Sequence, residues 1–176
     1  LWMRQSGMEA AILKAASHGT PIFGICGGYQ MLGDTLSDPH HVEAGGEIKG
    51  MGLLPMDTVF SPQKTRTRVT GRIQKLPGLL SNLEGTEVEG YEIHMGESVP
   101  SGEVQNTTEI TDGVSGVTKM DGLSVENVYG SYVHGFLDRE EVSKGIVEAI
   151  GRKKGIDVTE MTSVDFAAFK ETQYDI

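Results

Sequence analysis

The sequence has a single cysteine, no long apolar run and comparatively few basic side chains, and each shortage excludes a class of protein. One cysteine cannot form a disulfide framework, so the chain fits a reducing compartment and we expect a cytoplasmic protein. No window approaches the roughly 20 apolar residues that cross a membrane. The 25 acidic side chains outnumber the 15 basic ones, and the formal charge of −10 disfavours nucleic acid and anionic membranes as partners.

The sequence lacks a P-loop and a convincing set of metal ligands. The chain holds no Gly-x-x-x-x-Gly-Lys-Ser/Thr sequence, so it cannot bind ATP through a P-loop. His40 and His41 lie close to the carboxylates of Asp38 and Glu43, but adjacent histidines point in different directions and no further ligand spacing follows. We therefore expect no metal and no cofactor in this chain.

The order of predicted elements indicates one α/β domain. The 176 residues suffice for a single hydrophobic core. An apolar run at 22–25 predicts a buried strand, with helices before it at 7–18 and after it at 28–33. This alternation predicts a mostly parallel sheet with flanking helices. Later strands are expected at 53–60, 64–73, 87–98 and 127–137, and later helices at 140–152 and 163–170.

Three other segments carry weaker predictions. The polar residues 99–113 are interpreted as a mobile loop, and Asp121-Gly122 as the turn of a hairpin. Basic side chains alternate with threonine and valine along 64–73. This period of two favours a solvated sheet face over a phosphate site. The basic side chains are Lys64, Arg66, Arg68 and Arg72.

Cys26 follows the apolar strand directly and precedes Gly27 and Gly28. A strand that turns into a helix through small residues is typical of a nucleophile elbow, where larger neighbours would clash. The helix that starts here would favour the thiolate, which is the attacking form. A lone cysteine is more often an inert buried thiol. The flanking glycines and the switch from strand to helix favour a nucleophile instead.

Two later positions carry candidate acid–base groups. His134 ends an apolar strand and precedes Gly135, which suits a side chain that emerges into a cleft. A histidine brought to a cysteine by the fold is the usual way to activate a thiol. Glu92 and His94 share one face of the strand predicted at 87–98, where they could line a pocket or face water. The pattern leaves both alternatives open.

Three stretches together resemble the amidotransferase domain of the cobyric acid synthase family. They lie at 24–33, 90–96 and 130–135, and the sequences at 50–55 and 169–175 are also similar to the family pattern. The resemblance covers most of the chain. It implies a class I glutamine amidotransferase-like, flavodoxin-like fold that includes extra antiparallel strands. It also implies that residues 1–176 form a partial domain, whose first strands and N-terminal synthetase domain are absent.

The resemblance implies a reaction. Cys26 would attack glutamine to form a γ-glutamyl thioester, with His134 as general base and then acid. The N–H of Gly27 would give one half of an oxyanion hole. Gln30, Tyr91, Glu92 and His94 would line the glutamine pocket.

The implied partner is a synthetase domain of the same polypeptide. That domain would use ATP and Mg²⁺ to activate carboxylates of adenosylcobyrinic acid a,c-diamide, the corrinoid acceptor. By the resemblance, the second oxyanion donor of the family would lie before Leu1. We therefore expect the chain alone to be a poor glutaminase, because one donor is worth about 3 kcal/mol.

The sequence departs from the wider class at one position. Many class I amidotransferases have a glutamate two residues after the histidine, where this chain has Phe136. The residue that orients His134 is then either Glu92 or Asp138.

Three alternative functions also stay open. They are a related subunit that amidates a peptidoglycan lipid precursor, an amidotransferase-like interaction domain without catalysis, and a cysteine peptidase.

Overall fold

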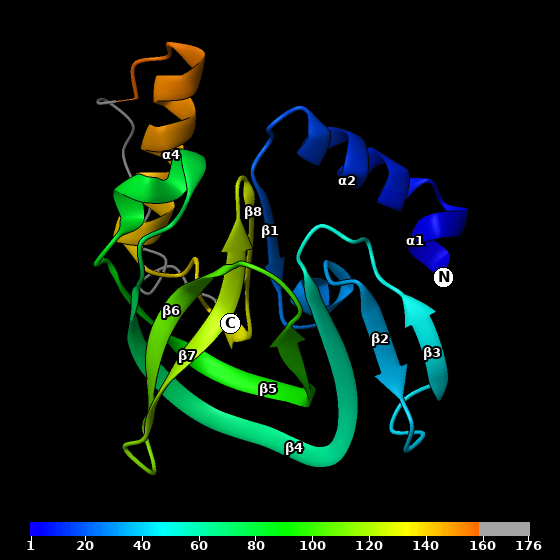
Figure 1. The fold of residues 1–176 in the computed structure, drawn as a ribbon. Coiled ribbons are helices and arrows are strands. Elements are labelled where there is room, and N and C mark those ends of the chain that lie inside the picture. The colour runs from blue at the N-terminus through cyan, green and yellow to red at the C-terminus, as the bar shows by residue number, and fades with distance from the viewer. Residues whose placement is uncertain (159–176) are drawn as a thin grey trace, which may run out of the picture.

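The computed structural model describes residues 1–158 (Figure 1). The helices are α1 (Trp2–Gln5), α2 (Met8–Ser17), α3 (Gly27–Met31), the 3-10 helix η1 (Gly78–Leu83) and α4 (Glu140–Lys154). The strands are β1 (Ile22–Ile25), β2 (Thr35–Asp38), β3 (Gly46–Lys49), β4 (Met56–Ile73), β5 (Glu87–Pro100), β6 (Gln105–Asp112), β7 (Thr118–Val125), β8 (Val128–Ser131) and β9 (Val133–His134). The helix predicted at 163–170 lies outside the described residues.

The strands of residues 1–158 form one mixed sheet. Its order is β1-β8-β7-β6-β4-β2-β3, and β5 joins β4 to β9. Only the β1–β8 and β2–β4 pairings are parallel, and the other pairings are antiparallel. The predicted α/β class is confirmed, but the sheet is less parallel than expected. Short connections from β6 to β8 account for this, because parallel neighbours need a long crossover.

Two strand predictions merge into β4, the longest strand. The predicted break between 60 and 64 is a register shift in the pairing with β5, between Val59 and Lys64. Gly96 stands opposite this shift with a φ of +96°, and a Cβ there would lie 2.8 Å from the carbonyl oxygen of Val59. β4 bends through a wide arc beneath the molecule (Figure 1). An irregular pair of this kind bends a strand without ending it.

Two predictions for the middle of the chain are wrong. Residues 105–112 of the expected loop form strand β6, whose buried positions include the hydroxyl side chains Thr107 and Thr108. Asp121-Gly122 does not turn the chain but lies inside β7. A Cβ at Gly122 would stand 2.0 Å from the carbonyl oxygen of Gly130. The glycine therefore permits close approach of β8, a use that resembles a turn signal in the sequence.

Two helices flank the β1–β8 pair, with α2 and α4 on opposite sides of it in the view of Figure 1. Asn127, just before β8, donates to the carbonyl oxygens of Ala16 and Thr20 and so ties the end of α2 to the sheet. Gly145 lets α4 approach Leu83 of η1, where a Cβ would lie 2.5 Å from the leucine side chain. Among the described helices, none is long and apolar enough to cross a membrane.

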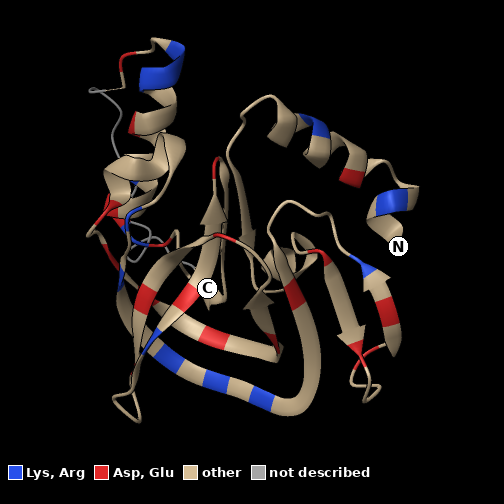
Figure 2. Cartoon of the chain, viewed as in Figure 1, with Lys and Arg blue, Asp and Glu red and all other residues tan. Residues whose placement is uncertain are grey.

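The basic residues of β4 lie on a solvated face, as predicted. Figure 2 shows blue bands that recur along the arc of β4. Lys64, Arg66, Arg68 and Arg72 are all exposed. Arg72 forms an ion pair with Glu87 at 2.9 Å.

Candidate active site around Cys26

Cys26 links β1 to α3 in a strained backbone conformation. Its φ of 53° and ψ of −116° fall in a region that residues other than glycine rarely adopt. Its N–H donates to the carbonyl oxygen of Ser131 at 2.9 Å, and its own carbonyl accepts from the N–H of Gln30 at 3.0 Å. Strain of this kind persists only where the surroundings hold it. The strand-to-helix turn predicted from the sequence is therefore present.

The glycines around Cys26 have different roles from those expected. A Cβ at Gly27 or Gly28 would meet nothing within 4 Å, so the predicted clash at these positions is wrong. At Gly24, in contrast, a Cβ would lie 2.7 Å from the Leu32 side chain and 2.8 Å from the Tyr29 nitrogen. Gly24 thus lets α3 fold back onto β1, whereas Gly27 and Gly28 leave open space beside the thiol.

The Cys26 side chain is half-buried and contacts strand β5. Its Sγ donates to the carbonyl oxygen of Ile93 on β5, at 3.4 Å. Burial raises the pKa of the Cys26 thiol, and a hydrogen bond from the Gly27 N–H opposes this effect only in part. The first amide of α3 thus favours the thiolate, as expected, but burial has the larger effect on the pKa. α3 has five residues, and the cost of burying a charge exceeds what its amides supply.

His134 ends β9 and lies against β5. Its imidazole stacks on the ring of Tyr91, with centroids 5.0 Å apart and planes 4° apart. Its Nε2 is buried and has no hydrogen-bond partner among the described residues. The ring borders a cavity of about 420 Å³ that Arg68, Tyr91 and Asp138 also line. A buried ring nitrogen without a partner is uncommon, and this marks His134 as a candidate acid–base group.

The fold brings Cys26 and His134 to the same end of the sheet without a hydrogen bond between them. Ile25 pairs with Ser131 in the parallel β1–β8 ladder, so Cys26 and His134 each follow closely after this pair. Strand β5 contacts both residues, through Ile93 at the thiol and Tyr91 at the imidazole. Without substrate, the hydrogen bond between a nucleophile and its base is often long or absent, and it shortens only when substrate binds.

The stretch 90–96 presents two faces, because neighbouring side chains of a strand alternate. Tyr91 lies on the face of His134, with which it is paired in the β5–β9 ladder. Glu92 and His94 point to the opposite face and line a second cavity of about 420 Å³. The lining of this cavity does not include Cys26 or His134. The four residues predicted to line one pocket therefore fall into separate surroundings.

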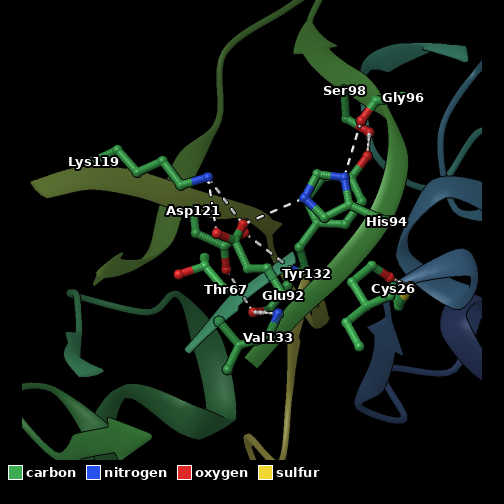
Figure 3. A network of polar contacts seen from close by, with 12 residues as sticks. Cys26, Thr67, Glu92, His94, Gly96, Ser98, Lys119, Asp121, Tyr132 and Val133 are labelled. Atoms are coloured by element: carbon green, nitrogen blue, oxygen red, sulfur yellow. Dashed lines mark hydrogen bonds and ion pairs between the residues drawn. The ribbon is translucent and has the colours of Figure 1, made fainter. Parts of the chain in front are cut away.

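Glu92 and His94 belong to a network of polar contacts (Figure 3). The Nε2 of His94 lies 3.4 Å from Oε1 of Glu92, and its Nδ1 lies 3.0 Å from the carbonyl oxygen of Gly96. The His94 ring stacks on Tyr132, with centroids 3.8 Å apart. Burial opposes ionisation of Glu92, yet hydrogen bonds from His94 and Lys119 keep the pKa of the carboxyl below its ordinary value. The pattern left open whether this pair faces water, and the structure places it in a pocket wall.

Gln30 joins the elbow helix to this network. Its Nε2 donates to the carbonyl oxygen of Met95 at 3.1 Å and to the hydroxyl of Tyr132 at 3.2 Å. The side chain is 5% exposed. The first bond holds α3 against β5, and the second holds it against Tyr132, which lies between β8 and β9. Its amide nitrogen is thus engaged within the protein, which suits a role in shaping the wall beside Cys26.

Sequence reasoning missed Asp121, Tyr132 and Lys119. Asp121 accepts hydrogen bonds from the Ser131 hydroxyl at 2.6 Å and from the Tyr132 N–H at 3.1 Å. Burial raises the pKa of this carboxyl. The spacing of Lys119 and Asp121, two residues apart on one strand face, was the available signal. The interpretation of Asp121-Gly122 as a turn hides this signal, because it places Asp121 outside a strand.

The two candidates for orienting His134 differ in their contacts. Glu92 pairs with Lys119 and His94 on the other face of β5. Asp138 lines the same cavity as His134, and its Oδ2 would lie 3.4 Å from a Cβ built on Gly135. The placement favours Asp138, which stays a prediction.

No group of three or more His, Cys, Asp or Glu side chains within residues 1–158 is arranged to hold a metal ion. The loop after β2 is held by hydrogen bonds to a carboxylate instead. The Asp38 carboxylate accepts the backbone N–H groups of Val42, Glu43 and Gly45 at 2.8, 2.8 and 2.9 Å. His40 and His41 lie in the turn that these bonds form.

Comparison with known proteins places this geometry in a family. Residues 1–142 match the CobB/CobQ-like glutamine amidotransferase domain. The chain is 47% identical over 182 residues to a cobyric acid synthase of Lachnoclostridium phytofermentans, with 99% of this chain and 36% of the relative covered. It is 45% identical over 177 residues to a cobyric acid synthase of Ruminiclostridium cellulolyticum, with 99% of this chain and 34% of the relative covered. The chain thus spans about a third of the length of these curated relatives.

Solved structures agree on the fold. A crystal structure of a glutamine amidotransferase superposes with a TM-score of 0.51 at 15% identity, covering 85% of this chain and 71% of the other. The structure of PurLQS from Thermotoga maritima gives a TM-score of 0.53 at 19% identity, covering 81% of this chain and 68% of the other. At these identities the likeness describes the fold alone.

Proposed function

Because the chain belongs to the CobB/CobQ-like glutamine amidotransferase family, we propose that it hydrolyses glutamine to supply ammonia, with Cys26 as nucleophile. One observation supports this proposal above the others. Cys26 holds a φ of 53° at the turn from β1 to α3, with open space over Gly27 and Gly28. A side chain in that position is presented to a ligand while its backbone is held by the sheet.

The proposed reaction has two steps that balance. The Cys26 sulfur bonds to the γ-carboxamide carbon of glutamine, its proton passes to His134, and the carbon–nitrogen bond breaks. The departing nitrogen takes that proton and leaves as ammonia. Water, deprotonated by His134, then attacks the thioester, which releases glutamate and restores the thiol. The Gly27 N–H, which already faces the sulfur, would donate to the oxyanion.

The raised pKa of Cys26 agrees with a base that acts during the reaction. A thiol that keeps its proton at rest needs an acceptor when substrate arrives. His134 has a buried Nε2 without a partner, and it lies along β5 from the thiol. Asp138 would orient the imidazole, and Tyr91 would fix its plane. Gln30, Glu92 and His94 would support the glutamine site indirectly, by holding the segment 93–96 whose Ile93 carbonyl oxygen contacts the thiol.

The relatives suggest the acceptor of the ammonia. They are named cobyric acid synthase, and this chain corresponds to about a third of their length. We propose that the remaining part carries the synthetase, which would use ATP and Mg²⁺ to amidate carboxylates of adenosylcobyrinic acid a,c-diamide. Relatives with that name at 38–47% identity favour the corrinoid acceptor over a peptidoglycan lipid precursor.

Labelling of the full-length protein tests the proposal. Diazo-oxo-norleucine, a glutamine analogue with an electrophilic carbon, should alkylate Cys26, and peptide mass mapping should locate the adduct. Glutamine should protect the thiol. Absence of an adduct would support an interaction domain without catalysis, and cleavage of peptides without release of ammonia from glutamine would support a peptidase.

A further inference from the structure

Lys119 of β7 reaches a buried carboxylate from the protein surface. Its Nζ lies 3.0 Å from each carboxylate oxygen of Glu92 (Figure 3). The Lys119 side chain is 47% exposed, whereas the Glu92 side chain is 1% exposed. A buried carboxylate keeps its charge only when nearby cations and donors replace the lost water. Lys119 therefore supports the charge of Glu92 while remaining in contact with solvent.

The carboxylate of Glu92 in turn contacts the ring of His94. One ring nitrogen of His94 faces Glu92 and the other faces the carbonyl oxygen of Gly96. The ring is therefore held from both sides, by a side-chain carboxylate and by a backbone carbonyl. Asp121 lines the same cavity as Glu92, and burial together with the charge of Glu92 raises the pKa of its carboxyl. Lys119 is therefore the cation that contacts the buried Glu92 carboxylate, and His94 is its second hydrogen-bond partner.

His94 transmits this arrangement to the elbow. It holds the carbonyl oxygen of Gly96, the residue at the irregular point of the β4–β5 ladder. Its ring lies flat against Tyr132, whose hydroxyl accepts from Gln30. Gln30 also donates to the Met95 carbonyl oxygen and belongs to the helix that begins after Cys26. The segment 93–96 is thus held between His94 and the elbow helix.

We propose that Lys119 is a positioning residue for glutamine binding. It acts through Glu92 and His94, which hold segment 93–96 against the elbow helix, where the Ile93 carbonyl oxygen contacts the Cys26 thiol. This inference rests on the proposed function of Cys26. Lys119 does not touch the thiol, so it affects how well substrate is placed and leaves the chemistry of the thioester to Cys26 and His134.

The test measures KM and kcat for glutamine hydrolysis by the full-length protein. Lys119→Met should raise KM about 5- to 10-fold and should change kcat less than about 2-fold. The expected rise in KM is modest because solvent screens the charge of the half-exposed lysine. Lys119→Arg should restore KM to within about 2-fold, because a guanidinium can pair with the same carboxylate. Lys64→Met is the matched control, since Lys64 is also an exposed lysine of the sheet and has no ion pair among the described residues.

A double variant checks the route. In a Glu92→Gln background, Lys119→Met should not raise KM further. A rise in KM as large as that of Lys119→Met alone would overturn the inference. An unchanged KM for Lys119→Met, or a loss that Lys119→Arg does not repair, would overturn it as well. These results differ from failure of the proposed function, in which the unaltered protein would release no ammonia and take up no diazo-oxo-norleucine at Cys26.

Discussion

The phenol ring of Tyr91 lies parallel to the imidazole of His134, with 5.0 Å between ring centroids and 4° between ring planes. The two residues are direct partners in the β5–β9 ladder. Tyr91 is 45% exposed, so its ring forms an outer wall for a histidine whose Nε2 is buried. The stack fixes the plane of the proposed base, whose Nε2 has no hydrogen-bond partner among the described residues.

Removal of that wall should slow glutamine hydrolysis. We expect Tyr91→Ala to lower kcat about 3- to 10-fold, which corresponds to the loss of one aromatic pair. Tyr91→Phe is the matched control and should stay within about 2-fold, because it keeps the stack. Steady-state release of ammonia measures both. Equal losses in the two variants would assign the effect to the hydroxyl rather than to the ring.

Replacement of the proposed base should have a much larger effect. His134→Ala should slow thioester formation about 10²- to 10⁴-fold, the usual contribution of a general base. Rapid-quench measurement of glutamyl-enzyme in the full-length protein follows this step. His18→Ala is the control, since His18 lies exposed at the end of α2. Thioester formation at the normal rate in His134→Ala would remove this residue from the mechanism.

Substitutions at the glycines of the elbow should affect the stability of the protein to different extents. Gly24→Ala should lower the free energy of unfolding by about 1–3 kcal/mol, because the new methyl group meets Leu32 and the Tyr29 nitrogen. Gly28→Ala should leave stability unchanged or raise it slightly, since its site is open and helical. Denaturant unfolding compares the two. A similar loss in both variants would contradict the packing described for α3.

The thiol should react slowly at neutral pH when no substrate is bound. Burial raises the pKa of Cys26, so the fraction of thiolate increases only at higher pH than for free cysteine. The rate of alkylation by iodoacetamide, measured against pH beside N-acetylcysteine, should therefore have its midpoint at the higher pH. A midpoint below that of N-acetylcysteine would show that the helix amides outweigh burial.

Local sequence patterns predicted the elements that build the elbow. The apolar run at 22–25 and the glycines after it predicted β1, α3 and the turn at Cys26, all of which the structure contains. These patterns succeed because each reports a local property, namely burial of a short strand or freedom of the backbone.

Predictions that depend on distant contacts did not succeed in the same way. Gly122 resembles a turn residue in the sequence, yet it is required by the backbone of Gly130 on the neighbouring strand. The charge on Glu92 is supported by Lys119, 27 residues later, so no local pattern could reveal the pair. The protonation of Cys26 depends on how deeply the fold buries it, which the neighbouring residues do not determine.

The most direct test of the central claim compares two nitrogen sources in the full-length protein. Cys26→Ala should abolish ATP-dependent amidation of adenosylcobyrinic acid a,c-diamide when glutamine is the donor. The same variant should retain amidation with ammonium chloride, because the synthetase would accept free ammonia. Undiminished glutamine-dependent amidation by Cys26→Ala would contradict the assignment of Cys26 as the nucleophile.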